Sequence, residues 1–202
     1  MKRKHIALLI VALLVVDQVV KVFIKTHMTL GESIHVFGSW FQIYFIENEG
    51  AAFGMSLGGE YGKLTLSLFR IVAVGAIGWF IDHLWRRQAP VGVIVGMALI
   101  MAGAMGNIID SAVYGLVFSE STFSSVATAF PEGGGYAGFL HGKVVDMLHF
   151  PLFTIEEMPS WLGWLSGADG DFTFFAPVFN IADSYISIAV IYFILFQWKY
   201  FK

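Results

Sequence analysis

The sequence predicts a mainly α-helical membrane protein, with four transmembrane helices and an outward-facing, β-rich cap formed by the loops 1–2 and 3–4. Apolar residues make up 57% of the chain and charged residues 13%, so a soluble fold would lack polar surface. Four apolar stretches are long enough to cross a bilayer, which takes about 20 helical residues. The region 36–53 is rich in aromatic and β-branched residues, which is typical of strands.

The spans follow from the apolar stretches, and the whole chain, 1–202, is expected to form one integral membrane domain. The predicted spans are 6–25, 64–81, 91–110 and 178–198, which leaves the two long loops 26–63 and 111–177. The first stretch exceeds the length of a signal-peptide core, and no small-x-small cleavage site follows it, so we expect it to be retained. Gly92 and Gly96 form a GxxxG pattern, which indicates helix packing.

The basic residues predict the orientation. Seven of them lie at the two ends of the chain and in the short loop 82–90, whereas the long loops hold only Lys63 and Lys143 against eleven acidic residues. Basic residues favour the cytoplasmic side. Both termini are therefore expected in the cytoplasm, with the long loops outside.

Composition also excludes several classes of function. The formal net charge is −3, and no basic stripe with interleaved aromatic residues is present, so a nucleic-acid partner is not expected. The chain has no cysteine, which excludes disulfides, zinc-thiolate sites and cysteine nucleophiles.

Polar residues gather at one depth of the predicted bundle, near its outer face. They come from three spans: Asp17 and Lys21, Asn107 and Asp110, Asn180 and Asp183. Charged groups inside a span are costly and usually functional. The alternative is that they only form interhelical hydrogen bonds that hold the bundle together. Arg70, early in the second span, either pairs with one of these acids or reaches outward, and we assign it no role.

Asp146 lies in the outer loop between Val144-Val145 and Met147-Leu148, so it should sit against apolar surface close to the bilayer. Asp183 is the natural second acid at that depth. Burial and a neighbouring acid both raise a carboxyl pKa. Two carboxylates that share a proton can activate water and protonate a carbonyl oxygen, without a metal or a cofactor. One hypothesis is therefore that Asp146 and Asp183 form a catalytic pair like that of aspartic proteases.

Three other functions have some support in the sequence, but each lacks a required feature. Residues 54–58 match the G-x-S-x-G pattern of serine hydrolases, but no α/β sheet can be drawn around them. His141, Asp146 and His149 could bind a metal, but no H-E-x-x-H is present. A transporter or proton relay would need polar residues through the full membrane, whereas the inner halves of the spans are almost wholly apolar.

Five short blocks in this order resemble the lipoprotein signal peptidase (signal peptidase II) family. They are Asp17-Gln18-x-x-Lys21, Asn48-Glu49-Gly50-Ala51-Ala52-Phe53-Gly54, Gly103-x-x-Gly106-Asn107-x-x-Asp110, Val144-Val145-Asp146 and Phe179-Asn180-x-Ala182-Asp183. With the spans, the resemblance covers the chain outside two long loop segments, 116–140 and 151–176.

The resemblance implies an aspartyl endopeptidase of the bacterial inner membrane, with its active site facing the periplasm. It would cut diacylglyceryl-modified prolipoproteins before the modified cysteine, act as a monomer in membrane lipid, and bind globomycin-type inhibitors. Catalysis would fall to Asp146 and Asp183. The site-supporting residues would be Asp17, Lys21, Asn48, Gly50, Ala51, Ala52, Phe53, Gly106, Asn107, Asp110, Asn180 and Ala182.

One departure from the family pattern affects the site. The family commonly has Arg directly after the Asp of the Gly-Asn-x-x-Asp block, where this chain has Ser111. A contact made by that Arg must be lost or supplied by another residue, such as Lys143. We also expect the small residues Gly50, Ala51, Ala52 and Gly106 either to admit an extended substrate backbone or merely to allow turns and helix packing.

Overall fold

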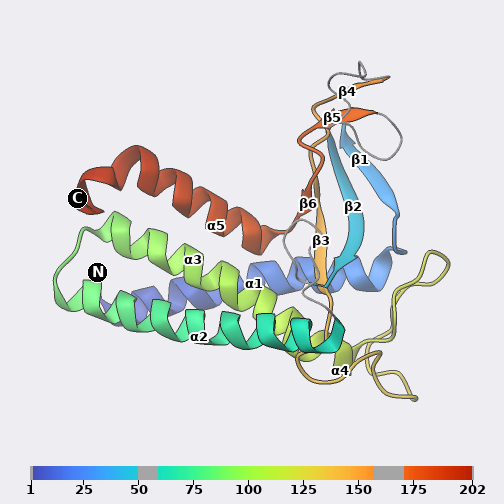
Figure 1. Ribbon diagram of the computed structural model, residues 1–202, viewed down its shortest axis with the longest axis horizontal. Helices are drawn as coiled ribbons and strands as arrows, with labels where there is room; N and C mark the ends of the chain where they lie inside the picture. The colour runs from blue at the N-terminus through green and yellow to red at the C-terminus, as the bar shows by residue number, and fades with distance from the viewer. Residues whose placement is uncertain (1, 50–58, 157–170, 202) are drawn as a thin grey trace.

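A computed structural model describes residues 2–49, 59–156 and 171–201. It is mostly helical, with two small sheets. Figure 1 shows the long helices lying side by side, with both termini at one end and the strands at the other. We refer to these as the termini end and the sheet end.

Four helices dominate the fold. They are α1 (Arg3–His27), α2 (Gly59–Arg86), α3 (Val91–Ile109) and α5 (Ile181–Tyr192). After α3 the chain continues through a π-helical turn, Asp110–Tyr114, into the short α4 (Gly115–Val117). After α5 it continues through a second π-helical turn, Phe193–Gln197, and a 3₁₀ turn, Trp198–Phe201.

By length and composition, four helical segments can cross a membrane. They are Arg3–His27, Leu64–Arg86, Val91–Val117 and Ile181–Tyr200. The third is half buried inside the protein, whereas the others bury 17% or less of their apolar window, so their remaining apolar surface faces outward. The prediction of a multi-pass membrane protein is therefore supported. The last helix begins at Ile181, three residues later than the predicted span, because Val178 and Phe179 join a sheet.

The larger sheet is antiparallel and has the strand order β1-β2-β3-β6. Its strands are β1 (Ser33–Phe37), β2 (Phe41–Asn48), β3 (Val144–His149) and β6 (Val178–Phe179). A second sheet pairs β4 (Phe153–Ile155) with β5 (Phe172–Phe174). Within the predicted strand region 36–53, strands occupy 36–37 and 41–48, and residues 50–53 lie outside the described part of the chain. The β2–β3 register sets Ile46 opposite Asp146.

Two apolar clusters stabilise the two ends of the molecule. The cluster at the termini end joins α1, α2 and α3; its most buried members are Ile6, Ile81, Leu84, Val93, Ile94 and Ala98. The cluster at the sheet end joins α1, the π-helical turn and strands β2 and β3; it includes Ile24, Phe45, Tyr114, Val145 and Met147. The second cluster fixes the sheet on the helices, which is what positions the polar residues described below.

Small residues let α3 and α5 approach closely. A Cβ atom added to Gly92 would overlap Tyr192, one added to Gly96 would overlap Phe193, and one added to Gly103 would overlap the carbonyl oxygen of Ala182. Only glycine allows a helix backbone this near to bulky side chains. The packing interpretation of the Gly92–Gly96 pattern is thus confirmed.

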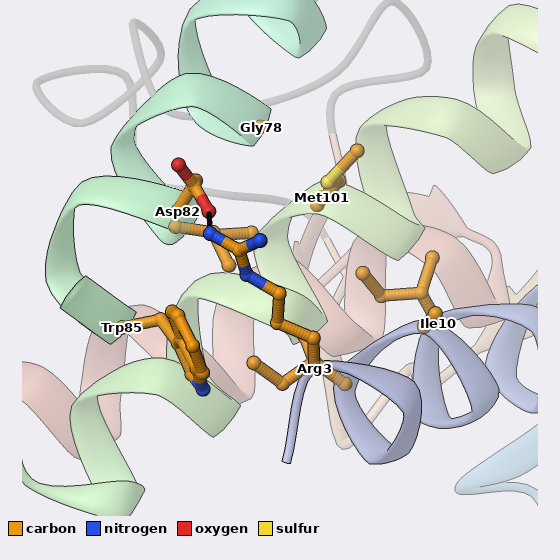
Figure 2. A pocket seen from close by; sticks show the side chains of 9 residues that line it. Arg3, Ile10, Gly78, Asp82, Trp85 and Met101 are labelled. Carbon is orange, nitrogen blue, oxygen red and sulfur yellow. Dashed lines mark hydrogen bonds and ion pairs between the residues drawn. The ribbon is translucent and has the colours of Figure 1, made fainter. Parts of the chain in front are cut away.

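At the termini end, α1, α2 and Met101 of α3 line an open pocket of about 210 Å³ (Figure 2). The Arg3 guanidinium pairs with Asp82 and lies 4.2 Å from the centre of the Trp85 ring. Ile10, Gly78 and Met101 line the apolar side of this pocket. These contacts join the start of α1 to the end of α2.

Candidate active site

The structure gathers the polar residues of the predicted site where the helix bundle meets the sheet. They come from α1, the end of α3 and the π-helical turn after it, β3, and the N-cap and first turn of α5. Their exposed fractions are 0% for Asp17, Lys21, Asp110 and Asn180, 3% for Asp146 and 9% for Asn107. Burial without water requires that polar groups find partners within the protein. The hydrogen bonds between them therefore define the site.

Asn180 connects the two aspartates of the proposed catalytic pair. Its side-chain Nδ2 donates to Asp146 Oδ1 at 2.6 Å. Its Oδ1 accepts from the backbone N–H of Asp183 at 2.9 Å, and its own backbone N–H donates to Asp183 Oδ2 at 3.4 Å. This reciprocal arrangement is a capping box, which begins α5 at Ile181. The residue that starts the helix thus also holds Asp146 and Asp183 beside each other.

Asn107 of α3 contacts both Asp183 and Asn180. Its Nδ2 donates to Asp183 Oδ1 at 2.8 Å. Its Oδ1 accepts from Asn180 Nδ2 at 3.1 Å and from Lys21 Nζ at 2.9 Å. Because the Oδ1 faces two donors, the orientation of this amide is determined, and its Nδ2 must face Asp183.

Lys21 is the centre of a buried ionic cluster behind the two amides. Its Nζ lies 3.2 Å from Asp17 Oδ2 and 2.9 Å from Asp110 Oδ2. Asp17 Oδ1 accepts from the backbone N–H of Ala182 at 3.0 Å, and Asp110 Oδ2 accepts from that of Val145 at 3.2 Å. The cluster therefore ties α1 and α3 to the start of α5 and to β3. These are the two elements that carry Asp183 and Asp146.

Gln18 completes this cluster and was not among the predicted site residues. Its Nε2 donates to Asp110 Oδ1 at 2.9 Å and to Asp17 Oδ2 at 3.1 Å, and its Oε1 accepts from the hydroxyl of Tyr114 at 3.1 Å. The signal was present in the sequence, since Gln18 is a polar residue inside an apolar span next to Asp17.

Asp146, which lies outside the spans, has a strongly perturbed acidity. Burial raises the pKa of Asp146 to about 7, and the neighbouring charge of Asp183 acts in the same direction. The hydrogen bonds from Asn180 and Asn48 and the charge of Lys21 oppose this shift. Asn48 Nδ2 contributes a long contact of 3.5 Å to Asp146 Oδ2. A carboxyl group with this pKa can carry or release a proton near neutral pH.

Several expectations for the small and basic residues can be compared with the structure. Gly50, Ala51, Ala52 and Phe53, and the G-x-S-x-G pattern at 54–58, lie outside the described residues. A Cβ atom on Gly106 would lie 2.6 Å from Asp17 Oδ2 and 3.1 Å from the Cβ of Ala182, so the smallness of Gly106 serves helix packing.

Ser111 and Lys143, the residues named for the departure from the family pattern, both have partners within the protein. Ser111 donates to the carbonyl oxygen of Asn107 at 3.0 Å. Within the part of the chain that the structure describes, the Lys143 ammonium contacts Glu120 at 3.1 Å and lies 4.0 Å from Glu47.

A second buried ion pair lies nearer the sheet and was missed by the sequence reasoning. Lys25, with a fully buried side chain, pairs with Glu47 of β2, and both contact the hydroxyl of Ser121 at 2.9 Å. The ring of Tyr136 lies 4.9 Å from the Lys25 ammonium. Lys25 is four residues after Lys21 and so lies on the same helix face, which could have indicated its burial.

Comparison with known proteins identifies the family. Residues 9–199 match the family model described as signal peptidase (SPase) II. The chain is similar to the lipoprotein signal peptidase of Porphyromonas gingivalis, with 53% identity over 190 residues that cover 93% of this chain and 80% of that protein. It is also similar to the lipoprotein signal peptidase of Amoebophilus asiaticus, with 33% identity over 175 residues that cover 84% and 67% of the two chains.

Solved structures agree with this comparison. A bacterial membrane enzyme determined by the in meso method at 2.3 Å resolution has a TM-score of 0.62 and 26% identity, covering 98% of this chain and 89% of that one. Another, at 1.9 Å resolution, has a TM-score of 0.59 and 27% identity, covering 96% and 92%. Because the family model matches nearly the whole chain, the protein belongs to the signal peptidase II family, whose members cleave lipoprotein signal peptides.

Proposed function

We propose that the protein is an aspartyl endopeptidase that removes the signal peptide from prolipoproteins carrying a diacylglyceryl-modified cysteine. The observation that carries this proposal is the Asn180 bridge. The side-chain amide of Asn180 donates to Asp146 and to Asn107, and it accepts from the backbone N–H of Asp183. Asp146 and Asp183 are the catalytic residues, and the Lys21 cluster holds the elements that bear them. This arrangement needs no metal or cofactor, because two carboxyl groups can supply both the acid and the base.

The pair acts on a water molecule and a peptide carbonyl. The ionised carboxylate takes a proton from water, whose oxygen attacks the carbonyl carbon, while the protonated carboxyl gives its proton to the carbonyl oxygen. Collapse of the resulting tetrahedral species breaks the C–N bond, and the amide nitrogen leaves with a proton from the pair. The raised pKa of Asp146 favours the shared proton on that side chain near neutral pH, although both titrations belong to the pair.

The position of the site fits a substrate that is anchored in the bilayer. The site lies at the sheet end of the spans, opposite the two termini (Figure 1). With both termini in the cytoplasm, as the basic residues predict, the site faces the periplasm at the outer surface of the bacterial inner membrane. The sheet then forms an outward cap over the point where the substrate helix must unwind to expose its amide bonds.

The partners follow from this reaction. The substrates are diacylglyceryl-modified prolipoproteins, and the enzyme works as a monomer in membrane lipid. Globomycin-type inhibitors would occupy the same site. The small residues Gly50, Ala51 and Ala52 would let the extended substrate backbone approach closely.

Reconstitution in lipid with two precursors tests the proposal. We expect the protein to shorten a diacylglyceryl-modified precursor and to leave an unlipidated precursor with the same sequence intact. Asp146→Asn and Asp183→Asn should each reduce cleavage by roughly 10³-fold or more, because each removes one proton-transfer group. Asp82→Asn is the matched control, since Asp82 lies at the termini end and pairs with Arg3 and Arg86. Cleavage by both aspartate variants at the wild-type rate would refute the mechanism.

A further inference from the structure

Arg70 lies on the face of α2 that packs against the rest of the bundle. Ser67, Ile81 and Leu84 have exposed fractions of 3%, 6% and 3%, and the helical steps of three and four residues that connect Ser67 to Ile81 pass through position 70. Phe69 and Val72, by contrast, are 69% and 71% exposed on the outer face. Arg70 is itself half-buried. A guanidinium on the inward face of a membrane helix requires partners inside the protein.

The depth of Arg70 follows from two independent contacts. A Cβ atom on Gly78 would lie 3.5 Å from the Met101 side chain, and α2 and α3 run antiparallel. Eight residues back along α2 therefore correspond to eight residues forward along α3, which sets Arg70 level with Ile109, beside Asp110. The contacts of α2 with residues 140–142 at the sheet end place Arg70 at the same depth.

At the sheet end of α2, the Ser67 hydroxyl donates to the carbonyl oxygen of Leu140 at 3.3 Å. The backbone N–H of Gly142, two residues later, donates to the carbonyl oxygen of Ser111 at 2.8 Å. One turn of α2 separates Ser67 from Arg70. Arg70 thus lies at the level of the buried acids, close enough for the charges of Asp183, Asp110 and Asp146 to act on it.

The charges around the catalytic pair show why a second cation matters. The acids that meet at this level are Asp17, Asp110, Asp146 and Asp183. Lys21 is held by the first two of these. No lysine or arginine occurs between residues 88 and 142 or between 181 and 198, so α3 and α5 add no cation.

The remaining charged groups near the sheet are engaged with each other or lie farther along it. Lys25 and Lys143 contact Glu47, and Lys143 also contacts Glu120. Glu49 follows β2 in the chain, and the His149 ring packs beside Tyr44 on the sheet. Arg70 is therefore a cation that α2 contributes at the level of the catalytic pair.

We propose that Arg70 is a positioning residue whose positive charge keeps the Asp146–Asp183 pair in its singly protonated, active state. The proposal rests on the proposed function, because it concerns the same pair. Four acids with Lys21 alone would favour a second proton on the pair, and a doubly protonated pair has no base to activate water. The Arg70 charge opposes that second proton.

The pH profile of cleavage distinguishes this role from a purely structural one. A nearby positive charge lowers both apparent pKa values of the pair, so its removal must move the whole bell-shaped profile to higher pH. In Arg70→Gln we expect an upward shift of roughly 0.5–1 pH unit in both limbs and a kcat about tenfold lower at neutral pH. Arg70→Lys retains the charge and should keep the wild-type profile. Arg86→Gln is the matched control, since it makes the same substitution at the exposed, termini end of α2.

The experiment uses the full chain reconstituted in lipid with the diacylglyceryl-modified precursor. Arg70→Met is a second uncharged variant, whose apolar side chain suits a membrane helix should the glutamine variant fold poorly. An unshifted profile in either folded uncharged variant would overturn the proposal. Failure of both to fold, with a folded Arg70→Lys, would also overturn it, because the charge would then serve the fold. Absence of cleavage by the wild-type protein would instead reject the proposed function itself.

Discussion

The side-chain amide of Asn180 donates to Asp146 across 2.6 Å, so the residue that begins the last helix also holds an acid on a distant strand. The two residues are 34 positions apart in the chain. The same amide contacts Asn107, and its carbonyl oxygen caps α5 at Asp183. A single side chain therefore sets both the start of a helix and the separation of the proposed catalytic carboxyl groups.

The two roles of Asn180 can be separated by substitution. In Asn180→Ser the hydroxyl oxygen can still accept from the backbone of Asp183, so α5 stays capped, but the donor to Asp146 is lost. We expect kcat to fall by roughly 10²-fold with little change in the melting temperature in detergent. Asn180→Ala should lose activity similarly and, because the cap is also gone, about 1 kcal/mol of stability. Full activity of the serine variant would show that the bridge is not needed.

The pKa of Asp146 predicts how stability depends on pH. An aspartate in the unfolded chain has a pKa of about 3.9, whereas burial and Asp183 raise that of Asp146 to about 7 in the folded protein. Between these values the folded state keeps a proton that the unfolded chain releases. Folding stability contributed by this group is therefore fully present below about pH 4 and is lost as the pH rises through 7, by on the order of 2–4 kcal/mol.

Asp146→Asn should remove this dependence. Melting temperatures of both proteins in detergent, measured from pH 4 to pH 8, should converge at the acidic end and separate toward pH 8, with the variant more stable there. Every other titrating group is the same in the two proteins, so their difference reports Asp146. Curves that stay parallel over the whole range would show that the Asp146 carboxyl is not held in this state.

The sequence predicted the spans and the convergence of their polar residues for a simple physical reason. A membrane helix has a fixed rise per residue, so the position of Asp17, Asn107 or Asp183 along its span also gives its depth. An acid and a lysine four residues apart, Asp17 and Lys21, must share a helix face. The buried cluster observed around Lys21 is the consequence of these two regularities.

The contacts made by the sheet could not be predicted in the same way. Asp146 reaches the site because β3 pairs with β2 in a register that sets it opposite Ile46, and a shift of one residue would turn its side chain to the other face. Nothing local in the sequence determines that register. The Lys25–Glu47 pair was missed for the same reason, since its acid lies on β2.

Lys21 should be important chiefly for stability. Replacing it with methionine leaves the carboxylates of Asp17 and Asp110 buried without their cation, which costs about 3–5 kcal/mol. We expect Lys21→Met to lower the melting temperature by roughly 10 °C or more. Lys4→Met, in the exposed first turns of the same helix, is the control and should melt as the wild type does. In the double variant Lys21→Met with Asp110→Asn, part of the loss should be regained, because one stranded charge is gone.

The close packing around Gly106 gives a test that involves no charged group. A methyl group at this position would lie 2.6 Å from Asp17 Oδ2 and 3.1 Å from the Cβ of Ala182, so α1 and α5 would both have to move. Gly106→Ala should therefore destabilise the protein by about 1–3 kcal/mol and also reduce kcat, because Ala182 precedes Asp183 directly. Gly75 of α2 is the matched control, since nothing lies within 4 Å of a methyl group there. Gly75→Ala should be neutral or stabilise by up to about 1 kcal/mol, through the better helix propensity of alanine. Equal melting temperatures for Gly106→Ala and Gly75→Ala would mean that the three helices do not meet at this point.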